Sequence, residues 1–100
     1  MDDGDRRTEI SPRLERHVRE TFDESVCDEA LDRLKAIVDP LGHDVSERVL
    51  AAVVLASNGD FDKFLEMAHL AEVDWRDVLV AAGLEYEDWE TELTRRLGVD

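Results

Sequence analysis

The stretch VLAAVVLA, residues 49–56, decides the fold, because it places eight apolar residues in succession. A helix that is apolar on every side is stable only when other elements surround it. A buried β-strand is the alternative for an apolar run of this length. However, Asp44 lies in front of the run with Glu47 three residues later, which is typical of the capping box that begins a helix. The sequence therefore predicts a central hydrophobic helix over residues 45–57.

Two helices are predicted before the central one. Ser11 and Pro12 are typical of a helix start, because serine caps the first turn and proline lacks an N–H that would have no partner there. Apolar residues then recur at helical spacing as far as Pro40, which disfavours helical geometry in the residue before it. Cap-type residues at 23–25 favour a break into two helices. One bent helix over residues 12–39 is the alternative.

The C-terminal half predicts three further helices. The first begins after Asp60, and a hinge at Val73 and Asp74 separates it from the second. The last helix has an apolar stripe of Tyr86, Trp89, Leu93 and Leu97. The sequence therefore predicts an all-α fold, a compact bundle of five to six short helices. We expect it to form a single domain over residues 10–100, after a disordered acidic tail over residues 1–9.

The segment ASNGDFDKF, residues 56–64, raises the question of a calcium loop, because it combines Asn, Gly and Asp. An EF-hand loop requires oxygen ligands at fixed positions before its glycine and a Glu six residues after it. With Gly59 as that glycine, the position of the Glu is occupied by Leu65. The pattern instead predicts a helix–helix connection, in which Asn58 or Gly59 is left-handed and Asp60 caps the next helix.

The charge composition is strongly acidic, with 26 Asp and Glu against 12 basic residues and a net charge of -14. Only two of the basic residues, Lys35 and Lys63, are lysines. An acidic, lysine-poor surface is typical of proteins from salt-rich cytoplasms, a halophilic-type composition. The alternative is that the acids mimic a nucleic acid toward a DNA-binding partner. Direct binding to nucleic acid is disfavoured, because no basic stripe is present to neutralise phosphates.

The sequence favours a non-catalytic, cytoplasmic protein. Cys27 is the sole cysteine, which excludes an intramolecular disulfide and suits a reducing compartment. Its place between apolar residues predicts an inert, buried thiol. His17 and His43 have no patterned partner for general base catalysis. The longest apolar run is far shorter than the roughly 20 residues that a membrane span requires, so no membrane association is expected.

Glu66 and His69 form the best metal-binding candidate. A Glu and a His three residues apart point the same way from a helix, as in carboxylate-bridged metal sites of helical bundles. A complete site would need a second pair, which a homodimer could supply. The alternative is that both side chains are solvated at the edge of a core helix, and on this interpretation no cofactor is expected.

Trp75, Tyr86 and Trp89 are the candidate partner-binding residues. All three lie at or near predicted helix starts, where side chains are often only partly covered, and large aromatic residues are favoured anchors in protein interfaces. The alternative is that they wedge the last two helices onto the bundle. The sequence therefore predicts a small interaction or regulatory protein. Its partner is another protein or a second copy of itself, bound through the C-terminal half.

Overall fold

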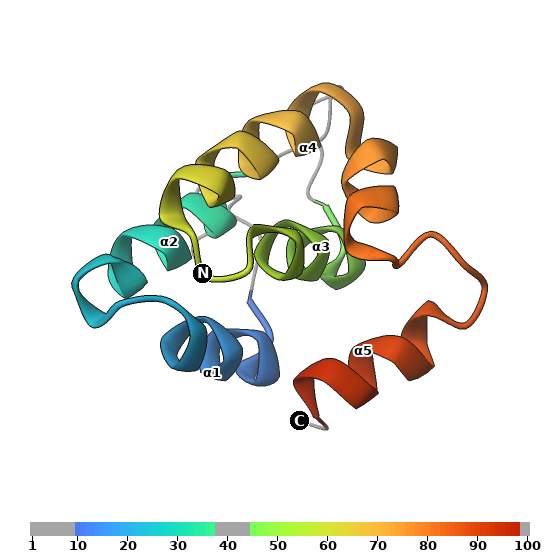
Figure 1. Cartoon of the computed structure of the whole chain (residues 1–100), viewed down its shortest axis with the longest axis horizontal. Helices are drawn as coiled ribbons and strands as arrows, with labels where there is room; N and C mark the ends of the chain where they lie inside the picture. The colour runs from blue at the N-terminus through green and yellow to red at the C-terminus, as the bar shows by residue number, and fades with distance from the viewer. Residues whose placement is uncertain (1–9, 38–44, 99–100) are drawn as a thin grey trace, which may run out of the picture.

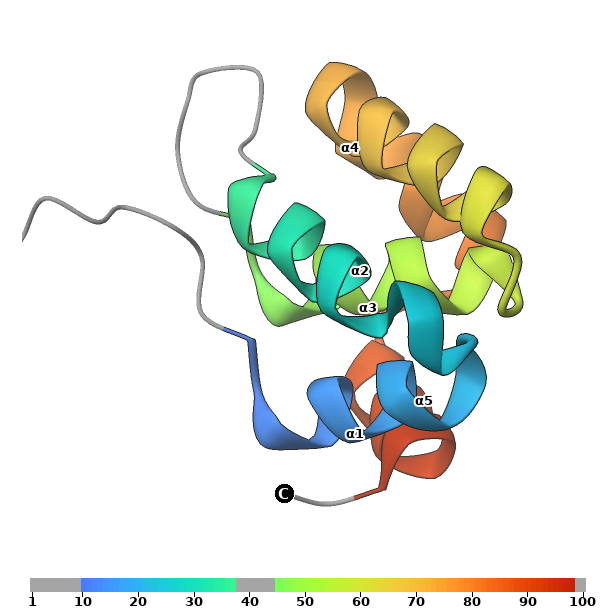
Figure 2. The ribbon, with the colours of Figure 1, turned by 90° about the vertical axis from the view of Figure 1, so that its left-hand side faces the viewer.

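The central helix of the computed structural model, α3, is Glu47–Ser57. Every side chain from Val49 to Leu55 is buried. α4 packs along α3, and α5 contacts both α3 and α1. Figure 1 shows α3 nearly end-on with the other helices around it, and Figure 2 shows it between α4 on one side and α1 and α5 on the other. The predicted central hydrophobic helix is therefore confirmed.

The structure describes residues 10–37 and 45–98, and in these ranges it contains five helices and no strand. The helices are α1 (Pro12–Thr21), α2 (Glu24–Ala36), α3 (Glu47–Ser57), α4 (Phe61–Ala82) and α5 (Trp89–Leu97). They surround one hydrophobic core to which every helix contributes. The all-α bundle is as predicted. The predicted tail over residues 1–9, Pro40, His43 and Asp44 lie outside the described residues.

α1 and α2 are separate helices, as the cap-type residues at 23–25 predicted. α1 ends at Thr21, and Phe22 is extended with its ring buried. The Asp23 carboxylate accepts a hydrogen bond from the Ser25 N–H at 3.0 Å and so caps α2. α2 ends at Ala36, earlier than the position of Pro40 indicated. Ile37 is already extended, and its side chain is buried in the core.

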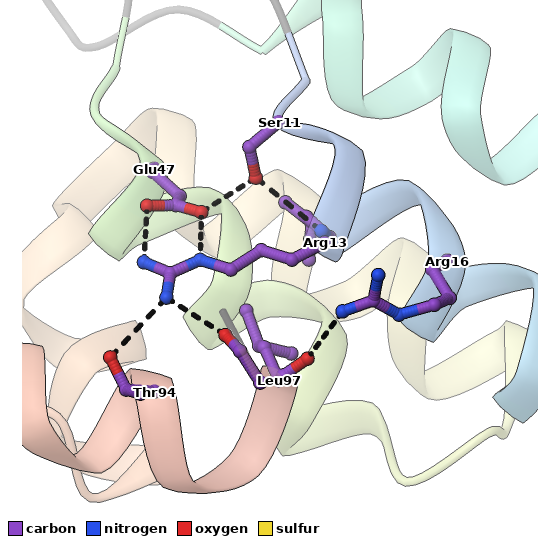
Figure 3. Close-up of polar contacts among 8 residues, drawn as sticks. Ser11, Arg13, Arg16, Glu47, Thr94 and Leu97 are labelled. Carbon is purple, nitrogen blue, oxygen red and sulfur yellow. Dashed lines mark hydrogen bonds and ion pairs between the residues drawn. The ribbon is translucent and has the colours of Figure 1, made fainter. Parts of the chain in front are cut away.

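The sequence predicted that Glu47 caps the start of the central helix as part of a capping box, and this prediction is wrong. α3 begins at Glu47 itself, two residues later than the predicted start at 45, so this side chain cannot occupy the third helical position. Its carboxylate is instead directed at α1. It accepts hydrogen bonds from Ser11 Oγ at 2.6 Å and from Arg13 Nε and Nη2 at 2.8 and 2.9 Å (Figure 3).

Arg13 and Arg16 then join α1 to the end of α5. Arg13 Nη1 donates to the Gly98 carbonyl at 3.1 Å, and Arg16 Nη2 donates to the Leu97 carbonyl at 3.0 Å. The last carbonyls of a helix have no partner within it and carry its negative dipole end, so a guanidinium is well placed there. We call Ser11, Arg13 and Glu47 the α1–α3 clasp. The hydrogen bonds from Arg13, supplemented by Ser11, lower the Glu47 pKa against the opposing effect of burial.

The connection between α3 and α4 is a turn of the kind predicted from residues 56–64. Asn58 and Gly59 are both left-handed, with φ of 52° and 81°. The Asp60 carboxylate accepts a hydrogen bond from the Lys63 N–H at 3.2 Å and caps α4. A Cβ atom on Gly59 would lie 3.0 Å from the Thr21 carbonyl oxygen, so glycine is required here both by its conformation and by close packing.

α4 corresponds to two predicted helices joined across a kink. Asp74 has non-helical angles, φ -155° and ψ 91°, at the hinge that the sequence indicated. Figure 1 shows the second half of α4 turning away sharply from the first. The last predicted helix is shorter than expected, because α5 begins at Trp89 and Tyr86 lies before it. Tyr86 is exposed and is not part of the buried stripe that Leu93 and Leu97 form.

Candidate interaction surface

The large exposed hydrophobic side chains gather in one part of the molecule. Within residues 10–37 and 45–98 they are Val73, Trp75, Val80 and Tyr86, with exposed fractions of 61%, 37%, 60% and 63%. We call these four residues the 73–86 surface. The kink, the second half of α4 and the following connection run in succession along the right-hand edge of Figure 1. Exposed apolar residues are ordinary when scattered, and grouping of this kind is typical of interaction sites.

The kink at Asp74 sets the direction of the second half of α4. The Asp74 carboxylate accepts a hydrogen bond from the Arg76 N–H at 3.2 Å, so it caps this half as an N-cap residue does. The Arg76 guanidinium lies 3.8 Å from the same carboxylate. Trp75 and Val73 flank the kink, where the helical ladder is interrupted, and both side chains stay partly in solvent.

Val80 is exposed because the second half of α4 has only one covered face. Val78, Leu79 and Ala82 are buried in the core, while Val80 and its neighbour Ala81 are exposed. A helix turns about 100° per residue, so three successive apolar residues cannot all face one side. Packing of Val78 and Leu79 in the core therefore directs Val80 to solvent.

α4 ends in a Schellman motif. Gly83 is left-handed with φ 76°, and its N–H donates to the Val80 carbonyl at 3.2 Å. The Leu84 N–H donates to the Leu79 carbonyl at 2.9 Å, and the Leu84 side chain is fully buried. This pair of bonds satisfies the last carbonyls of the helix and fixes the point at which the connection leaves it.

Two arginines hold the connection between α4 and α5. Arg48 Nε donates to the Leu84 carbonyl at 2.9 Å, and its guanidinium carbon lies 5.0 Å from the centroid of the Trp89 ring. Arg96 Nη1 donates to the Ala82 carbonyl at 2.7 Å. A surface on such a connection is preorganised, which lowers the entropic cost of binding.

The three predicted partner-binding residues differ in their surroundings. Trp75 and Tyr86 belong to the 73–86 surface. Trp89 is half-buried, packs against the core and lies under Arg48, so it corresponds to the wedge that was the alternative interpretation. The sequence interpretation missed Val80, because an apolar residue in an apolar helix is read as core, and it assigned Val73 to the hinge and not to a surface. The run VLV at residues 78–80 was the available signal.

Carboxylates are frequent in the segment that carries the 73–86 surface. Between residues 72 and 90 the sequence has seven acidic residues and one basic residue, Arg76. A hydrogen bond with the Glu85 carboxylate, together with its charge, raises the Tyr86 pKa, because both favour the protonated phenol. Glu85 itself is half-buried, and its Oε1 atom is covered without a hydrogen-bond partner in the described part of the chain.

The predicted metal pair is exposed on the first half of α4. Glu66 lies 3.9 Å from Lys63 Nζ, and His69 lines a shallow hollow between α2 and α4 together with Arg33 and Glu72. No group of three or more His, Cys, Asp or Glu residues suited to a metal ion occurs within residues 10–37 and 45–98. A site shared with a second copy of the chain stays a prediction.

Cys27 and His17 lie at the inner faces of their helices. Cys27 is buried, and its Sγ lies 3.6 Å from the carbonyl oxygens of both Val18 and Phe22, as expected of an inert thiol. His17 is half-buried beside α5. Burial lowers its pKa, nearby Glu20 opposes the shift, and Arg96 adds to it.

In the described ranges no helix combines the length and the apolar character that crossing a membrane would require. Comparison of the chain with protein families, with curated proteins and with solved structures gives no match. The 73–86 surface is therefore the feature on which a function can be argued.

Proposed function

We propose that the protein is a small non-catalytic interaction or regulatory module that binds another protein through the 73–86 surface. The observation that carries the proposal is the grouping of the large exposed hydrophobic side chains of the described chain on the kink, the second half of α4 and the connection to α5. In the rest of residues 10–37 and 45–98, the large apolar side chains are buried in the core or packed against it. A bound partner would remove these apolar side chains from water, which explains why the fold leaves them exposed.

The support of the surface fits this role. Asp74 caps the second half of α4, Arg48 and Arg96 bind the carbonyls behind the connection, and Leu84 anchors it in the core. Aromatic residues on a rigid support contribute large contact area at a low entropic cost. Trp75 and Tyr86 are the expected anchors, and Val73 and Val80 are the expected apolar contacts around them.

Site-specific crosslinking in the cells that make the protein tests this proposal. A photoreactive amino acid is placed at Val80, and in a control variant at Glu24, the exposed first residue of α2. Figure 1 shows α2 on the side of the molecule opposite the second half of α4. We expect a discrete adduct with one protein from position 80 and none from position 24. Equal adducts from both positions, or none from position 80, would contradict a binding surface at residues 73–86.

A further inference from the structure

The charges around the 73–86 surface restrict what kind of partner can bind there. The seven acidic residues between 72 and 90 are Glu72, Asp74, Asp77, Glu85, Glu87, Asp88 and Glu90. Five of them are exposed, and Asp74 and Glu85 are half-buried. The guanidinium of Arg76, the one basic residue in this range, lies 3.8 Å from the Asp74 carboxylate. Arg48 and Arg96 also lie against the connection, at the Leu84 and Ala82 carbonyls, so three guanidiniums stand against seven carboxylates near the apolar side chains, and the rim is negative.

Glu85 adds a specific unsatisfied interaction to this rim. Its Oε1 atom is covered by the protein and has no hydrogen-bond partner within the described residues. Leaving a desolvated carboxylate oxygen unpaired is unfavourable, and a charged donor is its strongest complement. Glu85 is half-buried, and its carboxylate has a hydrogen bond with exposed Tyr86, so this carboxylate lies directly beside a residue of the 73–86 surface.

We infer that the partner is a cationic protein segment, whose apolar side chains cover Val80 and Tyr86 while a Lys or Arg pairs with Glu85. This inference rests on the proposed function. Charge complementarity selects the partner's sign, and the apolar centre selects side chains such as Leu or Phe between the basic residues. Anionic lipid surfaces and nucleic acids carry the wrong charge for this rim.

A second copy of the chain is a poor occupant of the same surface. Two copies meeting through a twofold axis bring identical patches together, so each acidic rim would face another acidic rim. Like charges in contact oppose association, and the whole chain adds a net charge of -14 on each copy. A cationic segment reverses this repulsion into attraction.

Calorimetric titration of the full chain with synthetic peptides tests the inference. The probe is a 16-residue helical peptide with Leu at every third or fourth position and Lys at the remaining positions. One matched peptide replaces each Lys by Glu, and another replaces each Leu by Ser. We expect the Leu and Lys peptide to bind with a Kd of about 10 μM at about 0.1 M salt, more weakly at about 1 M salt, and the Glu peptide not to bind.

Variants of the protein separate binding at this surface from general attraction to an acidic chain. We expect Glu85→Gln to weaken binding of the Leu and Lys peptide about fivefold and Val80→Asn about tenfold. Glu24→Gln on α2 removes the same charge at a distant place, so binding should stay within about twofold of the unchanged chain. Circular dichroism confirms that each variant is folded.

Equal peptide binding by the unchanged chain, Glu85→Gln and Val80→Asn would overturn the inference that a cationic segment binds at this surface. If position 80 still crosslinks to one protein, the proposed function survives that result and only the partner's chemistry is wrong. A dimer in sedimentation that Val80→Asn dissociates would assign the surface to a second copy and would also overturn the inference.

Discussion

α3 and the second half of α4 both have apolar sequences, but they differ in how completely other elements cover them. Residues 49–55 are all apolar and all buried, whereas residues 78–82 are all apolar but leave Val80 and Ala81 in solvent. The difference comes from what packs around each helix. α3 has helices around it, while beyond the second half of α4 the chain turns outward into the connection before α5 (Figure 1). An apolar helix therefore needs other elements around it to form a core. Where one side of such a helix stays uncovered, the protein has an apolar surface that a partner can bind.

The same substitution at Val53 and at Val80 should give the largest contrast between the two helices. Val53 is fully buried in α3, so Val53→Asn places an amide without partners in the core and should cost about 4 kcal/mol of unfolding free energy. Val80 is exposed and Val and Asn have similar helix propensities, so Val80→Asn should change the unfolding free energy by less than about 0.5 kcal/mol. Urea denaturation measures both. Similar losses at the two positions would show that Val80 is packed in the core.

The second contrast is between the glycines at the two ends of α4, whose replacement by alanine should destabilise the protein to different degrees. Gly59 is left-handed and crowded by the Thr21 backbone, so Gly59→Ala should cost about 2 to 3 kcal/mol. Gly83 is also left-handed, but a Cβ there meets no atom of the described chain within 4 Å, so Gly83→Ala should cost only about 1 kcal/mol. Thermal unfolding of the two variants compares them. A larger loss at Gly83 would mean that the connection after α4 is more tightly packed than described.

Trp89 and Tyr86 should separate into a structural and a surface residue. Trp89→Ala removes a half-buried ring and its contact with Arg48, at an expected cost of about 2 kcal/mol. Tyr86→Ala should cost less than about 0.5 kcal/mol, because the side chain is exposed. Chemical denaturation of both variants gives the comparison. If Tyr86→Ala is the more destabilising change, its assignment to the binding surface should be abandoned.

The last comparison concerns the α1–α3 clasp, whose loss should cost less than the larger change in each comparison above. Glu47→Gln removes the charge that accepts hydrogen bonds from Ser11 and Arg13, and we expect a loss of about 1.5 kcal/mol at pH 7. Glu29→Gln is the matched control, because Glu29 forms an exposed pair with Arg33 at 3.6 Å and should contribute about 0.3 kcal/mol. Equal losses in the two variants would show that α1 is not held by this clasp.

The contribution of Glu47 should also depend on pH in one direction. Its pKa in the folded protein is lowered from the ordinary value of 4.5, so the unfolded chain binds this proton more readily. The stabilisation is therefore complete above about pH 5 and is lost as the pH falls through the lowered value. The difference in unfolding free energy between the unchanged chain and Glu47→Gln should shrink over that range. A difference that grows on acidification would reverse the assigned sign.

The sequence predicted most of the fold, because helix starts and ends are encoded locally. Asp23, Asp60 and Asp74 each cap a helix segment where the sequence placed a boundary, and Gly59 ends the central helix region as expected. Such signals depend on hydrogen bonds within a few residues, so they can be read without knowing the tertiary structure. The kink at Asp74 was predictable for the same reason.

Long-range contacts account for what the sequence analysis missed. Glu47 has a partner 34 residues away in Arg13, which no local pattern reveals, and its apparent role in a capping box was misleading. Arg48 and Arg96 bind backbone carbonyls, which have no signature in the side-chain pattern. Val80 required knowledge of which side of α4 is covered. The candidate surface therefore became visible only once the helices were placed around α3.

Mapping of peptide binding by nuclear magnetic resonance is the most direct test of the central claim, that the uncovered side of α4 and the connection after it form the binding surface. The isotope-labelled full chain is titrated with the Leu and Lys peptide, and backbone amide shifts are followed. We predict that shifts concentrate between residues 73 and 88 and that α1 and α2 stay unchanged. Shifts centred on α1 and α2, or no shifts at saturating peptide, would contradict the claim.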